Sequence, residues 1–195
     1  MELLLVRHAR PLRIEANDGV ADPSLDDVGR SQAAALADWL ATESIDTVYA
    51  SPLRRAVETA EPLARRLGLR LVQHDGVVEW DRDSTSYIPI EELKAENDPA
   101  WTAMRDEQWD VLGVDPTAFR QRVESAIDAI ALSHPSQRVA VVCHGGVINA
   151  YTGAVLGFDR VFWFEPRYTS ITRVLVHRDG TRSLFTLNEL PHLRD

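Results

Sequence analysis

Two short motifs place basic and imidazole side chains directly after apolar runs. Residues 3–11 read LLLVRHARP, so Arg7 and His8 follow four apolar residues, and residues 139–144 read VAVVCH, so His144 follows a second apolar run. Each run is long enough for a buried strand and too short to span a membrane. A strand that ends in cationic and imidazole groups is suited to hold an anion.

A third cluster lies in SPLRRAVETA, residues 51–60, where Arg54 and Arg55 follow another apolar segment. Two histidines and two or three arginines around one point suit a phosphate dianion, because guanidinium groups bind phosphate oxygens bidentately. The backbone amides of Gly145 and Gly146, just after the second histidine, are expected to add partial positive charge. These residues therefore predict a phosphate site.

One imidazole in such a site can attack phosphorus and form a covalent phosphohistidine. Its nucleophilic nitrogen must be unprotonated, and neighbouring arginines favour this because like charge lowers the pKa of the imidazolium. The leaving alkoxide then needs a proton. A carboxylic acid near the phosphate dianion would have its pKa raised and could supply that proton.

The surrounding elements explain how distant motifs would meet. Strands are expected at 2–6, 47–50, 69–74 and 138–143, helices at about 26–41, 51–68, 115–130 and 145–156, and a hairpin at 170–177 and 182–188. This alternation predicts an α/β fold with a mostly parallel sheet. Ligands of such sheets bind beyond the carboxyl ends of the strands, so Arg7, His8 and His144, with Arg54 and Arg55 one turn into the next helix, should share one crevice.

Two of these helices carry specific expectations. Ser51 is expected to cap a helix that begins at Pro52 and ends at Gly68. The helix at 26–41 should bury the apolar positions that recur at helical spacing: Val28, Ala35, Leu36, Trp39 and Leu40.

Residues 76–113 are less regular, with two prolines and three tryptophans. We expect short helices at about 90–97 and 99–107 that form an inserted lid or substrate segment. The length of 195 residues suits a single domain, 1–195, around one core.

The composition of the chain limits the classes of molecule that it is expected to bind. The net charge of −9 argues against nucleic acid and against an anionic membrane surface. Cys143 is the lone cysteine, and no Cys/His spacing suggests a metal site. Glu2 stands where a signal peptide would carry lysine or arginine, so we expect a cytoplasmic protein. The oligomeric state is open, with a homodimer as one option because the hairpin offers an edge strand.

The motifs LLLVRHARP, DPSLDDVGRSQAAAL, SPLRRAVETA and VVCHGGVI, in this order, resemble the histidine phosphatase superfamily, the phosphoglycerate mutase-like branch 1. The resemblance implies a three-layer α/β/α sandwich and a small phosphorylated substrate, with no metal or cofactor. It also implies that His8 accepts the phosphoryl group, that Arg7, Arg55 and His144 bind phosphate, and that Arg54 is a solvated neighbour.

The family's proton donor is a carboxylate after the arginine helix, and GVVEW places Glu79 there. Asp75, Asp81 and Asp83 compete for this role. The resulting hypothesis is hydrolysis of a phosphomonoester in two steps: attack by His8 with Glu79 as the acid, then hydrolysis of the phosphohistidine with Glu79 as the base.

Some positions depart from the family pattern and keep alternatives open. Ala9 follows the histidine where many members have glycine, Ile14 stands where mutase-type relatives carry asparagine, and the segment after Glu79 lacks the usual glycines. One alternative is phosphoglycerate-mutase-type phosphoryl transfer. Another is a phospho-ligand binding module without turnover, and a metal hydrolase is a weaker fourth option.

The other candidate residues favour structural roles. His74, His134, His177 and His192 lack catalytic context, and a Cys143 nucleophile is disfavoured because its thiol should point to the opposite face of the strand from the site. Trp80 directly follows the candidate acid, so a role in the wall of a substrate pocket is about as favoured as one in the core. Trp101 and Trp109 favour core or interface positions.

Overall fold

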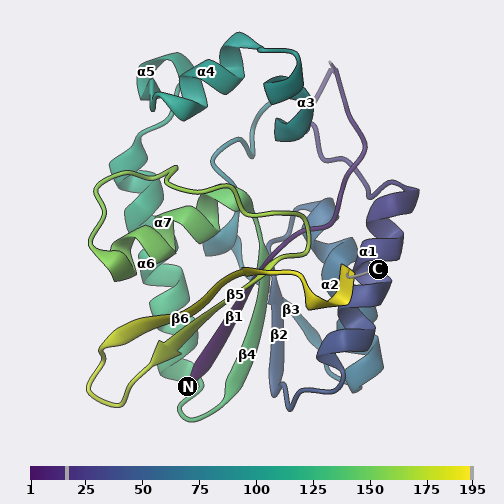
Figure 1. Cartoon of the computed structure of the whole chain (residues 1–195), viewed down its shortest axis with the longest axis vertical. Helices are drawn as coiled ribbons and strands as arrows, with labels where there is room; N and C mark the ends of the chain where they lie inside the picture. Colours follow the sequence, from purple (N-terminus) through teal and green to yellow (C-terminus); the bar gives the residue numbers. More distant parts are fainter. Residues whose placement is uncertain (16–17, 194–195) are drawn as a thin grey trace.

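A six-stranded sheet forms the centre of the molecule in the computed structural model, which describes residues 1–15 and 18–193 (Figure 1). The strands are β1 (Glu2–Arg7), β2 (Thr47–Ala50), β3 (Leu71–Gln73), β4 (Arg138–Cys143), β5 (Ile171–Val176) and β6 (Arg182–Glu189). Their order is β3-β2-β4-β1-β5-β6. Strands β1 to β4 pair with one another in parallel. Strand β5 is antiparallel to β1, and β6 is antiparallel to β5. The predicted mostly parallel sheet is therefore confirmed.

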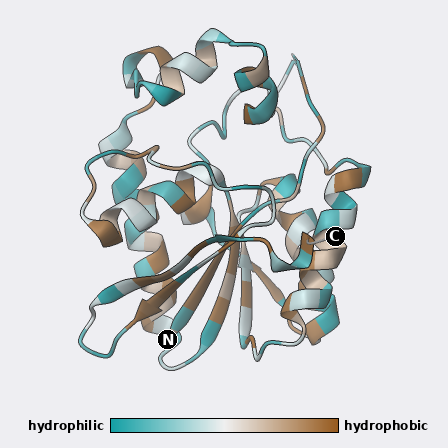
Figure 2. Ribbon diagram, in the orientation of Figure 1, coloured by the Kyte–Doolittle hydropathy of each residue, from teal (hydrophilic) through white to brown (hydrophobic). Residues whose placement is uncertain are grey.

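Two helices cover each face of the sheet and complete the predicted three layers. Helices α1 (Asp27–Leu40) and α2 (Arg54–Leu67) pack on one face, and α6 (Pro116–Ser133) and α7 (Gly145–Leu156) pack on the other. Alternation along β1 supplies both cores: Leu3 and Leu5 face α6 and α7, whereas Leu4 faces α1 and α2. The central strands are accordingly largely hydrophobic in Figure 2.

The predicted cap of α2 is wrong. The helix begins at Arg54, after Leu53 in an extended conformation, so Ser51 is not its N-cap residue; the Ser51 hydroxyl accepts instead from the Leu53 amide at 3.3 Å. Asp22 takes that role from a distant loop, since its carboxylate accepts a hydrogen bond from the Arg54 amide at 2.8 Å. The predicted end is confirmed: Gly68 has φ 66°, a left-handed conformation that glycine adopts without strain.

The predicted span of α1 is confirmed, but part of its predicted buried face is wrong. Leu36 and Leu40 are buried as expected, whereas Val28 and Trp39 are 46% and 43% exposed. Small residues lie inward instead, and Gly29 packs so closely that an added Cβ would lie 2.0 Å from the carbonyl oxygen of Arg10. The buried face of α1 therefore consists of Gly29, Ala33 and Ala37 together with the two leucines.

Three short helices lie beyond the carboxyl ends of the parallel strands (Figure 1). They are α3 (Ile90–Ala95), α4 (Pro99–Arg105) and α5 (Trp109–Leu112), and we call residues 90–112 the helical cap. The expected helices at 90–97 and 99–107 correspond to α3 and α4. Short 3₁₀ turns occupy Asp75–Val77 and Pro191–Leu193. Residues 8–15 and 18–25, between β1 and α1, contain no helix.

None of the helices within residues 1–15 and 18–193 combines the length and the apolar character needed to cross a lipid bilayer.

Candidate active site

The parallel pairing of β1 with β4 brings the two histidines together. Arg7 pairs with Cys143 in the register, so the next residues, His8 and His144, leave the sheet side by side. Their ring centroids lie 5.2 Å apart with a 59° angle between the ring planes. Arg55, in the first turn of α2, is buried like both histidines. Packing thus gathers the predicted cluster at one edge of the sheet.

The backbone fixes the tautomer of His8. Its Nδ1 lies 2.8 Å from the carbonyl oxygen of Ala9, and because a carbonyl only accepts hydrogen bonds, Nδ1 carries the proton. Burial, together with the charges of Arg55 and Arg7, lowers the pKa of His8 well below its usual value. The ring is therefore neutral, with the lone pair on Nε2.

His144 and Arg55 hold polar atoms without protein partners. Both ring nitrogens of His144 and the Nε of Arg55 are buried and make no hydrogen bond to the described residues. Burial and the Arg55 charge lower the pKa of His144, so it too is neutral. Buried donors normally find partners, so these unpaired atoms mark a place suited to a polar ligand.

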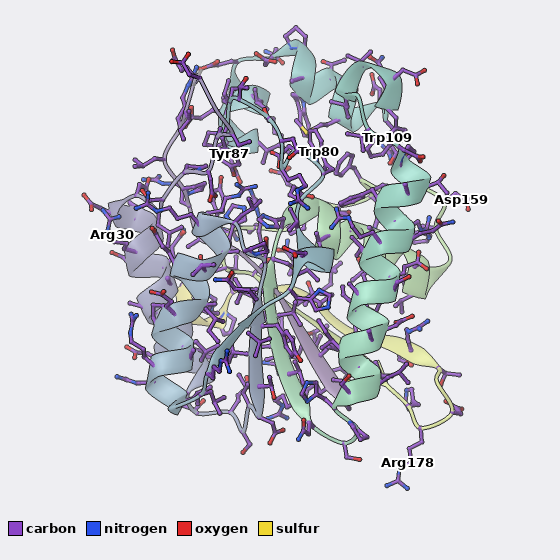
Figure 3. The ribbon with its side chains drawn as sticks, turned by 180° about the vertical axis from the view of Figure 1, so that it is seen from behind. Arg30, Trp80, Tyr87, Trp109, Asp159 and Arg178 are labelled. Carbon is purple, nitrogen blue, oxygen red and sulfur yellow. The ribbon has the colours of Figure 1, made fainter. Side chains whose placement is uncertain are left out.

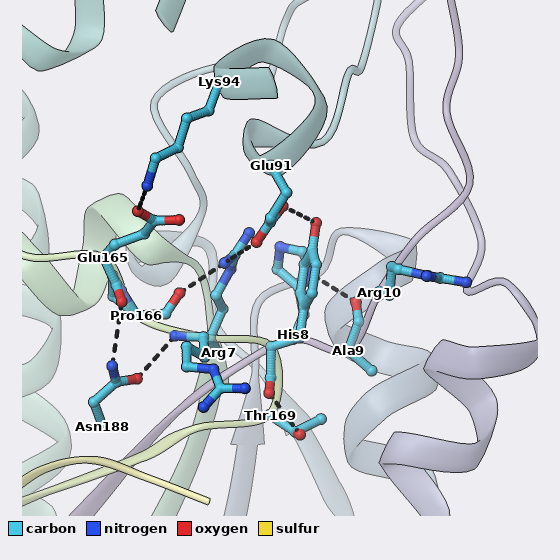
Figure 4. A network of polar contacts seen from close by, with 12 residues as sticks. Arg7, His8, Ala9, Arg10, Glu91, Lys94, Glu165, Pro166, Thr169 and Asn188 are labelled. Carbon is cyan, nitrogen blue, oxygen red and sulfur yellow. Dashed lines mark hydrogen bonds and ion pairs between the residues drawn. The ribbon is translucent and has the colours of Figure 1, made fainter. Parts of the chain in front are cut away.

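Arg7 is held from three sides (Figure 4). Its Nη1 donates to Glu91 Oε1 at 2.9 Å and to the carbonyl oxygen of Pro166 at 2.7 Å. Its guanidinium carbon lies 3.9 Å from the centroid of the Tyr168 ring, and the Tyr168 hydroxyl donates to Glu91 Oε2 at 2.8 Å. Glu91 belongs to α3, so the helical cap contacts the site through an ion pair.

Arg55 is positioned by its own helix and by two residues that follow Glu79. Its guanidinium carbon lies 4.6 Å from the Tyr87 ring centroid, and its Nη2 lies 3.4 Å from Asp81 Oδ1. Thr59, one turn later, donates to the Arg55 carbonyl oxygen at 2.7 Å and accepts from the Ala9 amide at 2.9 Å. Thr59 therefore joins the turn after His8 to α2, a role that sequence reasoning missed.

Glu79 is the most buried of the four candidate acids. Its Oε2 accepts from the Gly146 amide at 2.9 Å and its Oε1 from the Trp80 amide at 3.1 Å. Burial and the nearby Asp81 charge raise the pKa of Glu79 to about 7, although these amides and Arg55 oppose the rise. The Gly146 amide, which we expected to add partial positive charge to a phosphate site, donates its hydrogen bond to Glu79.

The competing acids are placed less favourably. Asp75 lies exposed in the 3₁₀ turn and away from the cavity, and the Asp83 side chain is 88% exposed at the cavity rim. Asp81 pairs with Arg55, and burial raises its pKa while the guanidinium opposes that rise. Geometry therefore favours Glu79 as the proton donor.

These groups form the floor of a cavity of about 930 Å³. Arg7, His8, Arg55 and Glu79 lie at its base, and the helical cap and residues 160–166 supply its walls. Trp80 and Trp101 line it, whereas Trp109 stacks on Phe162 with centroids 5.2 Å apart. Figure 3 shows Trp80 and Tyr87 between the cap and the sheet.

The residues expected to be structural have structural partners. His134 bonds Tyr49 at 2.9 Å, His74 accepts from Gly76 at 3.0 Å, His177 contacts Ser183 at 3.1 Å, and His192 contacts Thr169 at 2.9 Å. Cys143 packs in the core beside α6 and α7, where burial raises the pKa of its thiol. Arg54 is largely exposed and pairs with Glu58 at 2.7 Å.

Within the described residues, no three His, Cys, Asp or Glu side chains are grouped so that they could hold a metal ion.

Known proteins similar to this chain belong to one family. Residues 3–189 match the family model described as histidine phosphatase superfamily (branch 1). Phosphoserine phosphatase 1 of Hydrogenobacter thermophilus is 28% identical, covering 99% of this chain and 94% of that protein. Phosphoglycerate mutase-like protein 4 of Arabidopsis thaliana is 31% identical, covering 76% of this chain and 68% of that protein.

Solved structures share the fold. A mutant phosphoserine phosphatase from Entamoeba histolytica, in complex with phosphoserine, has a TM-score of 0.79 at 21% identity, covering 99% of both chains. A mycobacterial glucosyl-3-phosphoglycerate phosphatase, in complex with VO3, has a TM-score of 0.78 at 24% identity, covering 96% of this chain and 98% of that one.

Proposed function

The chain belongs to branch 1 of the histidine phosphatase superfamily, and from this premise we propose that it hydrolyses phosphomonoesters through a covalent phosphohistidine on His8. One observation carries the proposal: the neutral imidazole of His8, two guanidinium groups and a carboxylic acid with a pKa of about 7 converge on the floor of a single cavity. A second neutral imidazole, that of His144, lies beside His8, with its ring centroid 5.2 Å from that of His8. The phosphatase relatives support hydrolysis as the outcome.

In the first step, the lone pair on His8 Nε2 attacks phosphorus while the bond from phosphorus to the ester oxygen breaks. The Nδ1 proton, held on the Ala9 carbonyl, keeps Nε2 available and stabilises the positive charge that develops on the ring. Glu79 gives its proton to the departing alkoxide. A carboxyl group with a pKa near 7 is suited to this role because about half of it is protonated at pH 7, whereas an ordinary glutamate is almost fully ionised there.

In the second step, water attacks the phosphohistidine. Glu79, now ionised, removes a proton from that water, the bond between nitrogen and phosphorus breaks, and the lone pair returns to Nε2. Acid and base are then the same residue in two successive protonation states, as a two-step displacement requires.

Arg7, Arg55 and His144 bind the transferring phosphoryl group in this proposal. The unpaired Nε–H of Arg55 and the one N–H of the neutral His144 ring are hydrogen-bond donors available to that group. Arg7 adds a guanidinium fixed by the Pro166 carbonyl and the Tyr168 ring. Such fixed charges stabilise the transition state without a reorganisation cost.

The test is hydrolysis of p-nitrophenyl phosphate in excess chelator by the parent protein and His8→Ala. We expect turnover in the parent and its loss in the variant, with no change in the folded circular dichroism spectrum. Brief incubation with a ³²P-labelled ester should trap an acid-labile, alkali-stable phosphoprotein in the parent alone. Full turnover in His8→Ala would refute the proposal.

The same preparation separates the alternatives. Interconversion of 2- and 3-phosphoglycerate that is faster than release of phosphate would identify a mutase-type transferase. Binding of inorganic phosphate or vanadate without turnover of any ester would identify a binding module.

A further inference from the structure

The cavity above the candidate catalytic residues is far larger than a phosphate group. Its volume is about 930 Å³, and one water occupies roughly 30 Å³ in the liquid. Clefts that enclose drug-sized ligands span about 300–1,000 Å³. Most of the space is therefore left for the alcohol part of the ester.

The walls of this space are mainly apolar and aromatic. Beside Trp80, the cap contributes Trp101 and Met104 from α4, and the segment after α7 contributes Phe162, Trp163 and Phe164. Trp80 meets Phe162 edge to face, with ring centroids 6.3 Å apart. Aromatic walls of this kind favour apolar and aromatic ligands, because the transfer of their apolar surface from water to the cavity is favourable.

A buried amide holds one of these walls in place. Asn149 is 2% exposed, and its Oδ1 accepts from the amides of Trp163 and Phe164, both at 3.0 Å. Its Nδ2 donates to the Phe164 carbonyl oxygen at 2.9 Å. The aromatic wall is thus preformed, which lowers the entropic cost of binding.

The charges around the cavity disfavour a second anionic group on the substrate. Besides Arg7 and Arg55, the described lining contains two cations, Arg105 and Arg160. Arg105 pairs with Asp106 at 2.7 Å, and Arg160 lies 3.8 Å from Glu107 and donates to the Arg105 carbonyl oxygen. A substrate carboxylate would therefore have to compete with acids that the chain already supplies.

The lining also carries carboxylates of its own beyond the floor. Asp83, Asp98 and Glu165 all line the cavity. Glu165 pairs with Lys94 at 2.7 Å, and Asp98 caps α4 through the Ala100 amide at 2.8 Å. Their negative charge adds repulsion against a carboxylated substrate.

We propose that the preferred substrate is a phosphomonoester of a bulky apolar or aromatic alcohol that has no negative charge besides its phosphate. This inference rests on the proposed function and specifies the substrate class of the same site. Trp101 is the specificity residue that we test, because it lines the cavity from the cap, where its ring centroid lies 5.4 Å from Lys94 Nζ.

The test compares kcat/KM for five esters of primary alcohols, none of which has the activated leaving group of an aryl phosphate. They are propyl phosphate, 3-phenylpropyl phosphate, phosphoserine, 3-phosphoglycerate and phosphocholine. We expect 3-phenylpropyl phosphate to exceed propyl phosphate by about tenfold or more, from burial of the phenyl ring. It should also exceed both carboxylated esters and phosphocholine.

Variants then locate the preference. Trp101→Ala should lower the ratio of kcat/KM between 3-phenylpropyl and propyl phosphate by about tenfold, and Trp101→Phe should restore part of it. Trp39→Ala is the matched control, since Trp39 lies 43% exposed on α1, outside the cavity lining, and it should leave the ratio unchanged.

Two kinds of failure are distinguishable. Hydrolysis of p-nitrophenyl phosphate together with a preference for phosphoserine, 3-phosphoglycerate or phosphocholine would overturn the substrate class alone. An unchanged ratio in a folded Trp101→Ala would do the same. Absence of turnover with every ester and with p-nitrophenyl phosphate would overturn the proposed function itself.

Discussion

Gly146 and Glu79 are in direct contact. The Gly146 amide donates to Glu79 Oε2 at 2.9 Å, and a Cβ added to Gly146 would lie 2.4 Å from Oε1. The carboxyl group therefore occupies the space that any larger side chain at position 146 would need. The first turn of α7 thus fixes where the proposed acid lies.

Gly146→Ala should displace Glu79 and lower kcat for alkyl phosphates by about tenfold or more, since proton transfer depends on a hydrogen-bond geometry that is lost within 1 Å. Gly145→Ala is the matched control, because its Cβ would meet nothing within 4 Å. Steady-state kinetics with propyl phosphate measures both. Equal activity of the two variants would mean that the carboxyl position is unimportant for turnover.

Glu79→Gln should separate the two proposed roles of this residue. With alkyl phosphates kcat should fall by about 10²–10⁴-fold, because the alkoxide loses its proton donor. With p-nitrophenyl phosphate the leaving group needs no proton, so we expect a rapid burst of one p-nitrophenolate per enzyme and then slow turnover, since water loses its base. Stopped-flow absorbance measures the burst.

Asp83→Asn is the control for that experiment, since Asp83 also lines the cavity but is 88% exposed. It should retain turnover with both ester types. In the parent enzyme, kcat/KM for propyl phosphate should decline above pH about 7 as Glu79 ionises, and that decline should be absent in Glu79→Gln. A burst-free, fully active Glu79→Gln would transfer the acid role to Asp81.

The position of a site residue could be predicted best from the sequence where that residue directly follows a strand or begins a helix. Arg7, His8 and His144 each follow an apolar strand, and the parallel-sheet rule is enough to bring them together. The helix that follows β2 placed both Arg54 and Arg55 near them, and the family resemblance singled out Arg55. These predictions succeed because periodicity and element order are local properties that a single chain displays.

The partners of these residues were beyond sequence reasoning because they come from distant segments. Glu91 reaches Arg7 across 84 residues, and Asp22 caps the helix of Arg54 across 32 residues. No local pattern marks either contact. The side chain of Asn149 similarly accepts hydrogen bonds from the amides of Trp163 and Phe164. Helical periodicity alone would predict only an ordinary packing role for Asn149.

The raised pKa of Glu79 should make stability depend on pH. An unfolded glutamate titrates near 4.5 and the folded one near 7, so between these values the folded state alone holds the proton. Stability from this group is complete below about pH 4.5 and is lost as the pH rises through 7, by at most about 3 kcal/mol. Glu79→Gln cannot ionise and should avoid that loss.

Urea unfolding of the parent and Glu79→Gln at pH 5 and pH 8 measures this effect. The variant should gain stability relative to the parent by roughly 2–3 kcal/mol between the two pH values. The pKa values of His8 and His144 are lowered, so their effect is to raise the stability of the folded state as the pH rises. Both histidines are present in the parent and in the variant, so this effect cancels in the difference between the two proteins. A pH-independent difference would contradict the assignment.

If Arg7 binds phosphate as we propose, Glu91 competes for it, because Glu91 Oε1 lies 2.9 Å from Arg7 Nη1 and the Glu91 side chain is 42% exposed. Glu91→Gln should therefore strengthen competitive inhibition by inorganic phosphate by about two- to fivefold, the range expected for a partly exposed ion pair. Arg7 should keep its position, since the Pro166 carbonyl and the Tyr168 ring still hold it. Glu92→Gln is the matched control: its carboxylate pairs with Arg13 at 3.0 Å, and neither residue lines the cavity. Weaker phosphate binding in Glu91→Gln than in Glu92→Gln would instead assign Glu91 the role of orienting Arg7.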